Sequence, residues 1–125
     1  MASFEELLEE LRSDKKMTQK DLANVLHVSV GTISNYERDV YYPEIEKLIN
    51  LADYFHVTID YLLGRCEHNF SPDVFEEKIV DNIDIGMAIK MIRNLPSERK
   101  RALLLLLDDM NFRVAFNQYR KKETL

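Results

Sequence analysis

The sequence predicts an all-α protein, with a bundle of helices in its first half and further helices in its second. Hydrophobic residues recur every three or four positions along much of the chain, a spacing that gathers them on one face of an α-helix. Three glycines and three prolines interrupt the 125 residues. Polar and apolar residues do not alternate for more than about four positions, as a half-buried strand would require. We therefore expect helices and no sheet.

The chain opens with two amphipathic helices. The first begins at Phe4, and its apolar face comprises Phe4, Leu7, Leu8 and Leu11. A second, short helix is predicted over 19–26. Thr18 precedes it and Asp21 lies three positions later, the pattern of a capping box at a helix start.

Three more helices complete the first half. Ser29 is a suitable N-cap for a third helix that ends near Arg38. Pro43 suits the first turn of a fourth helix. A fifth helix is expected over 58–63, ending at Gly64, which tolerates left-handed backbone geometry. The apolar face of the fourth helix is predicted to comprise Ile45, Leu48, Ile49, Ala52 and Phe55.

An internal repeat supports this division. Residues 22–33 resemble residues 51–62, and each segment predicts a helix, a tight turn and a second helix. His27 and His56 occupy the two turns. In each copy an alanine allows the second helix to approach closely, and a serine or threonine caps that helix.

Composition excludes several classes of protein. The single Cys66 cannot form an internal disulfide, and the longest apolar run, 102–107, is far shorter than the roughly 20 residues of a membrane span. We therefore expect a cytoplasmic protein that does not enter a membrane. The net charge of −5 lies entirely in 1–66, where Lys and Arg number 7 and Asp and Glu 12. Strong nonspecific attraction to polyphosphate is thus excluded.

Beyond Cys66 the chain changes character, which predicts one domain over 1–66 and a second, helical segment over 67–125. The pair Ser71-Pro72 predicts a helix that continues to about residue 80. Further helices are expected over 84–94 and 98–119. The last of these has apolar residues on more than one side, which favours a subunit interface, although packing against the first domain stays open. The interface residues are predicted to be Leu103, Leu106, Leu107, Met110 and Val114.

The segment 19–38 has the layout of a helix-turn-helix, with Ala23 where the second helix must approach. At these residues the chain resembles the phage-repressor-like, or Xre, helix-turn-helix family. The resemblance runs from about Phe4 to Gly64 and is carried by residues 17–23, 28–29, 32–38, Pro43 and 57–64. It implies a five-helix bundle whose third helix enters the major groove of double-stranded DNA.

The resemblance also implies residue roles. Asn35 is the strongest candidate base reader, because its amide can donate to adenine N7 and accept from adenine N6. Arg12 and Glu37 match a buried salt bridge of the family. The base-facing positions are Val30, Gly31, Thr32 and Asn35, and the DNA backbone is expected to contact Lys16, Gln19, Lys20, Ser34, Tyr36 and Arg38. His27 and His56 replace a turn residue that is commonly glycine in the family, so we expect mildly strained left-handed turns rather than a metal site.

These observations predict a dimeric, sequence-specific transcriptional repressor that binds an inverted-repeat operator. The alternative within the binding class is an antitoxin or protein-interaction module that uses the same fold. An enzyme is not expected, because no phosphate-binding glycine loop, nucleophile triad or metalloprotease motif is present, and no cofactor is predicted. The operator, the inducing signal and any regulatory partner stay open.

Overall fold

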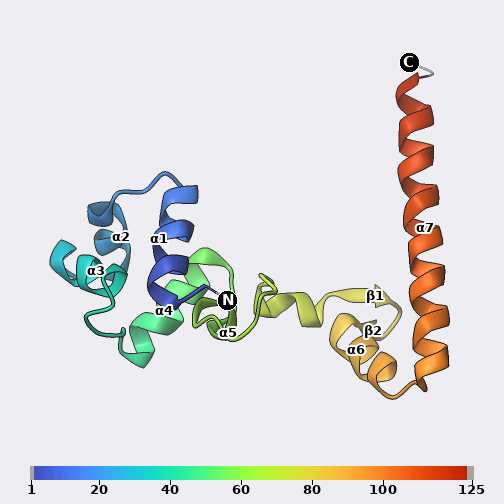
Figure 1. The fold of residues 1–125 in the computed structure, drawn as a ribbon, viewed down its shortest axis with the longest axis horizontal. Helices are drawn as coiled ribbons and strands as arrows, with labels where there is room; N and C mark the ends of the chain where they lie inside the picture. Colours follow the sequence, from blue (N-terminus) through green and yellow to red (C-terminus); the bar gives the residue numbers. More distant parts are fainter. Residues whose placement is uncertain (1, 124–125) are drawn as a thin grey trace. The chain divides into compact units, whose positions relative to one another are not determined.

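The computed structural model describes residues 2–123 and is helical over most of that range (Figure 1). The chain divides into two compact units, one ending at Val74 and the other beginning at Phe75. The sequence predicted a boundary after Cys66, whereas the first unit of the structure continues to Val74. The all-α prediction is confirmed apart from one small pair of strands in the second unit.

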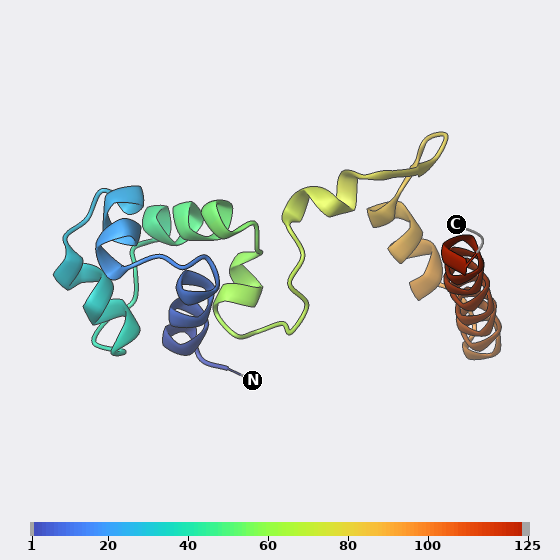
Figure 2. The same cartoon turned by 90° about the horizontal axis from the view of Figure 1, so that it is seen from above.

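Within the described part of the first unit, five α-helices surround one core (Figures 1 and 2). They are α1 (Phe4–Asp14), α2 (Gln19–Leu26), α3 (Val30–Glu37), α4 (Ile45–Phe55) and α5 (Ile59–Leu62). Helix α3 supplies Ile33 to the core with 0% of the residue exposed, so its opposite face is turned outward. The other most deeply buried side chains are Leu8, Leu22, Leu26, Leu51, Val57 and Leu62.

Helix α4 starts later than predicted. Pro43 lies ahead of the helix, and Glu44 occupies the N-cap position before Ile45. The predicted apolar face is also partly wrong, since Ile45 is 77% exposed and Ile49 is 42% exposed. Helix α4 contacts the core through Leu48, Leu51, Ala52 and Phe55, and the core extends to neither Ile45 nor Ile49.

The internal repeat appears in the backbone as two nearly identical corners. His27 ends α2 with φ and ψ of 55° and 45°, and His56 ends α4 with 54° and 46°. After each histidine a valine donates its N–H to the carbonyl of the preceding helix's alanine at 3.0 Å. Ser29 and Thr58 then accept a backbone N–H three residues on at 3.1 Å. The two predicted left-handed turns are confirmed.

The predicted helix over 72–80 is wrong. A 3₁₀ helix (η1, Pro72–Glu76) is followed by a short strand (β1, Lys78–Val80), which pairs antiparallel with β2 (Ile83–Asp84). The strands are joined through Asp81, whose φ is +49°, and Asn82. Asp and Asn favour such hairpin turns, and the neighbouring β-branched residues favour strands. The hairpin is too short to show the alternation by which strands are usually recognised.

Two helices complete the second unit, α6 (Ile85–Arg93) and α7 (Ser97–Glu123), and they confirm the helices predicted over 84–94 and 98–119. Asp84 caps α6 by accepting the N–H of Met87 at 2.7 Å. None of the helices in the described range 2–123 has the length and apolar character needed to cross a membrane.

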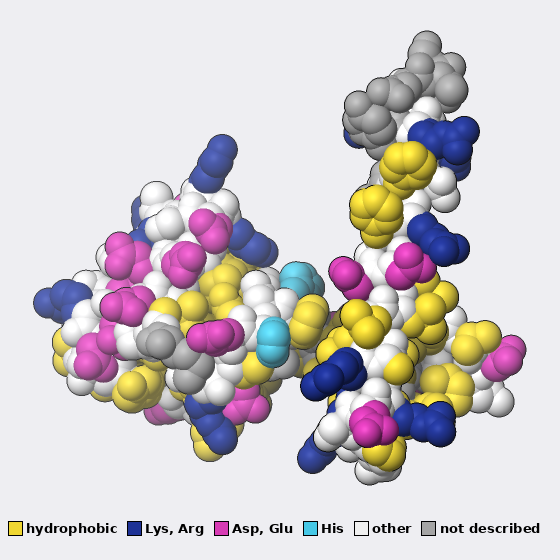
Figure 3. Space-filling model, turned by 45° about the vertical axis from the view of Figure 1, so that its right-hand side comes forward, with side chains coloured by type: hydrophobic (Ala, Val, Ile, Leu, Met, Phe, Trp, Pro, Cys, Tyr) yellow, Lys and Arg dark blue, Asp and Glu magenta, His cyan; other side chains and the backbone are white. Residues whose placement is uncertain are grey.

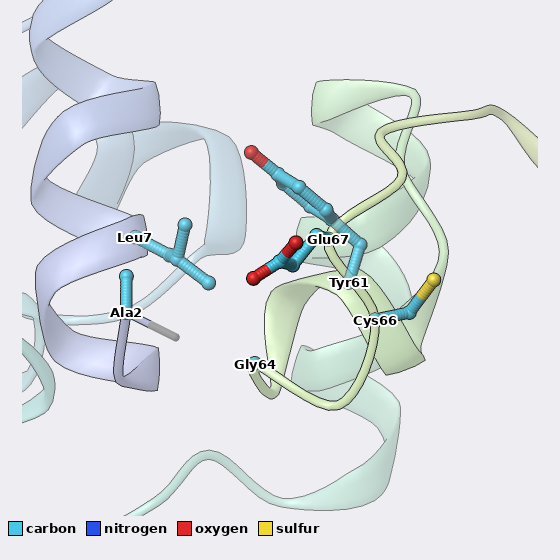
Figure 4. Close-up of a pocket in the computed structure, with 6 residues that line it drawn as sticks. All are labelled: Ala2, Leu7, Tyr61, Gly64, Cys66 and Glu67. Atoms are coloured by element: carbon cyan, nitrogen blue, oxygen red, sulfur yellow. The ribbon is translucent and has the colours of Figure 1, made fainter.

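Gly64 lies where a side chain would not fit. Its φ is +73°, and a Cβ built on it would lie 2.4 Å from the carbonyl oxygen of Ala2. Figure 4 shows Gly64 and Ala2 at the edge of a hollow of about 160 Å³ beside α1, into which Tyr61 projects. Gly31 in α3 is different, because the nearest atom to such a Cβ would be Ser29 Oγ at 3.8 Å.

We expect Gly64→Ala to destabilise the protein and Gly31→Ala to leave it as stable or slightly more so. Left-handed geometry costs an alanine about 1–2 kcal/mol, and the contact with the Ala2 backbone adds to this. Alanine in a helix gains roughly 0.5–1 kcal/mol over glycine. Thermal unfolding of the full chain checks both. Equal melting temperatures for the two variants would contradict the close approach at Gly64.

Candidate nucleic-acid interface

Helices α2 and α3 form the helix-turn-helix, and the core fixes how α3 is presented. Ile33 and Tyr36 face inward, with exposed fractions of 0% and 4%. Val30 is 43% exposed in the first turn of α3, and Gly31 beside it is also exposed. Asn35 lies on the same outward side of the helix and is half-buried. The predicted base-facing residues therefore share one accessible surface of the first unit.

The first turn of α3 is held by its cap. Ser29 Oγ accepts the N–H of Thr32 at 3.1 Å, and the two hydroxyl oxygens lie 2.9 Å apart in a second hydrogen bond. The Thr32 side chain is thereby fixed near the N-terminus of α3, where partial positive charge favours contact with phosphate or a base acceptor. Gly31 leaves the backbone of this turn open to close approach.

The amide of Asn35 has two neighbours from the end of α3 and the loop after it. Arg38 Nη2 donates to Asn35 Oδ1 at 2.8 Å. Asn35 Nδ2 donates to the hydroxyl of Tyr41 at 3.4 Å. Because arginine can only donate, the first contact fixes which end of the amide is oxygen.

The structure brings Arg12 and Glu37 into one ion pair that joins α1 to the end of α3. Arg12 Nε donates to Glu37 Oε1 at 2.6 Å and Nη2 to Oε2 at 3.2 Å. Their side chains are 14% and 5% exposed. Arg12 Nη1 also donates to the carbonyl of Met17 at 2.8 Å. The hydrogen bond to Glu37 raises the pKa of the Arg12 guanidinium, which keeps it charged.

Gln19 has a structural partner that the sequence did not indicate. Its Nε2 donates to Glu37 Oε2 at 2.8 Å, so the same carboxylate holds α1, α2 and α3 together. Gln19 is the first residue of α2, where its backbone N–H has no partner within the helix. Glu37 therefore positions the Gln19 side chain, while the backbone N–H of Gln19 at the helix start is a donor that suits a phosphate.

The predicted backbone-contacting residues differ in where they lie. Lys16, Lys20 and Arg38 are exposed, and Ser34 is half-buried on α3. Tyr36 is 4% exposed, and its ring packs edge-on against Tyr41 with centroids 5.6 Å apart. This burial raises the pKa of the Tyr36 hydroxyl. This packing leaves little of Tyr36 exposed, and its contact with the DNA backbone stays a prediction.

The loop between α3 and α4 holds residues that sequence reasoning missed. Tyr41 and Tyr42 are 46% and 60% exposed and border a hollow of about 430 Å³ beside α3. Lys47 of α4, which was also missed, caps α2 by donating from Nζ to the carbonyl of Leu26 at 2.8 Å. The signal available in the sequence was the apolar and aromatic run that directly follows Arg38 and Asp39, which is unusual for a polar surface loop.

Comparison with known proteins agrees with this geometry. Residues 8–62 match the helix-turn-helix family. The uncharacterised HTH-type transcriptional regulator YqaE of Bacillus subtilis is 35% identical over 90 residues, which cover 70% of this chain and 75% of YqaE. This chain belongs to the helix-turn-helix family of transcriptional regulators. The phage-repressor-like resemblance is thereby confirmed.

Other similar proteins include phage repressors. The cryptic phage CTXphi transcriptional repressor RstR of Vibrio cholerae is 27% identical over 110 residues, covering 88% of each chain. The crystal structure of the P22 c2 repressor with a synthetic operator matches 53% of this regulator and all of that chain, with 29% identity and a TM-score of 0.50.

Some relatives are similar over only part of their length. The regulator ImmR of Bacillus subtilis is 40% identical over 60 residues, which cover 48% of this chain and 47% of ImmR. The activator BcrR of Enterococcus faecalis is 45% identical over 64 residues, covering 51% of this chain and 31% of BcrR. The matched part of this chain thus spans about half, or less, of the length of these two relatives.

Hydrophobic side chains of the second unit are exposed along α7, with charged side chains between them (Figure 3). Leu103 is half-buried and lines a hollow of about 330 Å³ next to Met91 and Ile92 of α6. The other predicted interface residues are exposed: Leu106 by 51%, Leu107 by 44%, Met110 by 51% and Val114 by 56%. Helix α7 therefore presents apolar side chains that its own unit leaves exposed.

We expect Arg12→Ala to lower the stability of the regulator by about 3 kcal/mol or more, because it leaves Glu37 buried without its cation. Arg65→Ala is the matched control: it removes an ion pair to Asp60 whose side chains are 74% and 60% exposed. Exposed pairs contribute less than about 1 kcal/mol. Denaturant unfolding measures both. Similar losses of unfolding free energy in the two variants would show that the buried Arg12 pair contributes no more to stability than an exposed pair.

Proposed function

We propose that this regulator is a homodimeric repressor that occupies an inverted-repeat operator and thereby blocks transcription. The single observation that carries the proposal is the outward face of α3. It presents a capped, open first turn followed by an oriented asparagine amide. The likeness to a repressor solved with its operator, and to a phage repressor over most of the chain, supports the same function. In this proposal the regulator binds its operator in the cytoplasm.

In this proposal the residues divide into base readers and backbone anchors. Val30, Thr32 and Asn35 face base edges, and Gly31 lets the backbone approach the groove. Val30 offers only apolar contact, so Asn35 supplies most of the hydrogen-bonded discrimination. The backbone anchors are Lys16, Gln19, Lys20, Ser34 and Arg38. For Gln19 the anchor is the helix start together with the side-chain N–H that Glu37 does not use.

The charge of the chain argues for two DNA-binding units acting together. With a net charge of −5, the regulator gains little from nonspecific attraction to phosphate. Few polar side chains face the bases, so one unit binds an operator weakly. Joining two units raises the effective concentration of the second at its half-site without new contacts. A two-fold dimer then favours half-sites about one DNA turn apart, roughly 10 base pairs.

Helix α7 is the proposed dimer interface. A helix whose large apolar side chains are about half exposed or more is unfavourable in water, because the hydrophobic effect favours burial of that area. A second copy offers the same surface in a symmetric contact. Leu106, Leu107, Met110 and Val114 lie near one side of the helix by its periodicity, while Leu105, Phe112 and Phe116 lie near the other.

An activator is the second candidate function, because BcrR is named an activator and is 45% identical to this chain over 64 residues. The antitoxin or protein-interaction alternative does not require sequence-specific DNA binding. Selection from fragmented genomic DNA, followed by sequencing, separates DNA binding from that alternative. A reporter placed behind a recovered site then distinguishes repression from activation by the sign of its response.

Asn35→Ala tests the base-reading face. On a recovered operator we expect a loss of about 1–3 kcal/mol in binding, with relaxed preference at one base pair. Asn50→Ala, which truncates an exposed asparagine on α4, is the matched control. Affinities for the operator and its single-base variants are measured for all three proteins. Unchanged base preference in Asn35→Ala would refute the docking of α3 in the groove.

Leu106→Glu and Leu105→Glu test the dimer interface. The two residues are 51% and 65% exposed, and adjacent positions differ by about 100° around a helix. A charge at Leu106 should separate the dimer and weaken operator binding, whereas the same charge at Leu105 should leave it intact. Light scattering gives the mass of each protein. A monomeric parent chain, or equal disruption by both substitutions, would contradict this interface.

A further inference from the structure

The amide of Asn35 is held at both of its ends by residues from outside the first turns of α3. Arg38 donates to its oxygen at 2.8 Å, and the Tyr41 hydroxyl lies 3.4 Å from its nitrogen. Arg38 follows α3 directly as its C-cap residue, and Tyr41 belongs to the loop that leads to α4. The end of α3 and that loop therefore control the orientation of a side chain proposed to read a base.

The hydrogen-bond capacity of the amide leaves one position at each end. A side-chain amide has two donor hydrogens and an oxygen with two acceptor positions. Arg38 uses one acceptor position and Tyr41 one donor hydrogen, so one acceptor and one donor remain. An adenine edge in the major groove presents one donor, N6–H, and one acceptor, N7. The held amide thus keeps the pair of positions that adenine requires, with oxygen and nitrogen already assigned.

Tyr41 is itself held by the core. Its ring lies edge-on against Tyr36, with the centroids 5.6 Å apart and the planes at 88°. Tyr36 is 4% exposed and part of the core cluster. The Tyr41 hydroxyl is therefore set in place by a buried neighbour, although 46% of Tyr41 is exposed. Tyr42 differs, because its ring lies against Phe4 with the centroids 5.5 Å apart.

We propose that Arg38 and Tyr41 are positioning residues that set the base preference of Asn35. The inference rests on the proposed function, in which Asn35 reads a base. It changes the role of Arg38, which as a phosphate contact alone would strengthen binding to all sequences alike. Holding the amide in one orientation instead favours adenine over bases that present a different order of donor and acceptor.

Tyr41→Phe removes the hydroxyl and keeps the ring, with Tyr42→Phe as the matched control. The probe is the operator duplex recovered from genomic DNA, together with duplexes changed at the one base pair to which Asn35→Ala is sensitive. We expect Tyr41→Phe to lower the preference for the original base about 2- to 10-fold, the size of one net hydrogen bond. Tyr42→Phe should retain the full preference.

Arg38→Met distinguishes positioning from phosphate contact. If Arg38 contacts a phosphate, Arg38→Met reduces the slope of log K against log salt concentration by about one unit, and base preference is unchanged. If Arg38 and Tyr41 position Asn35, then Arg38→Met or Tyr41→Phe lowers the base preference of the parent protein. The same substitution has no further effect on base preference in an Asn35→Ala background. Circular dichroism of each full-length variant confirms that the helices are intact.

The outcomes separate the two proposals. A relaxed preference in Asn35→Ala, together with full preference in both Tyr41→Phe and Arg38→Met, overturns the positioning role and leaves the repressor proposal standing. Unchanged preference in Asn35→Ala overturns base reading itself, and the positioning role with it. The positioning role is established if Tyr41→Phe and Arg38→Met each lower the base preference of the parent protein but have no effect on it in the Asn35→Ala background.

Discussion

The carboxylate of Glu37 is the point on which the DNA-binding unit depends. It accepts hydrogen bonds from Arg12 of α1 and Gln19 of α2, and it belongs to the last residue of α3. A buried charge with both oxygens satisfied is favourable only in that geometry, and leaving it unpaired is strongly unfavourable. The angle between α2 and α3 is therefore specified by polar contacts as well as by the core. The buried Ile33 sets how closely α3 packs on the core, and the bonds of Glu37 to Arg12 and Gln19 hold the C-terminal end of α3 in place.

The first unit was largely predictable from the sequence because its signals are local and mutually consistent. Thr18, Ser29 and Thr58 each cap a helix where the capping pattern places one, and the two histidines end helices in left-handed geometry. Capping depends on a few neighbouring residues, so a single sequence carries it. The exposure of Ile45 was not predictable in this way, because helical periodicity identifies a face but not how far the core extends along it.

Contacts between distant side chains were harder to predict. Gln19 was assigned to phosphate from its place at a helix start, and its bond to Glu37 depends on how three helices meet. The burial of Tyr36 and the contact of Tyr41 with Asn35 arise from the path of the loop after α3, which no periodic pattern describes. The hairpin of β1 and β2 was missed because strands of three and two residues are too short for alternation to appear.

The duplicated corner has a consequence for how the chain folds. Each corner joins consecutive helices through a left-handed histidine, a hydrogen bond from a valine N–H to an alanine carbonyl, and a hydroxyl cap, all within one short stretch of sequence. Contacts between near neighbours require little loop closure, and proteins rich in them reach the native state in microseconds to milliseconds. Because both corners follow the same local rule, α2 with α3 and α4 with α5 can each assemble before the long-range bond from Arg12 to Glu37 closes the bundle.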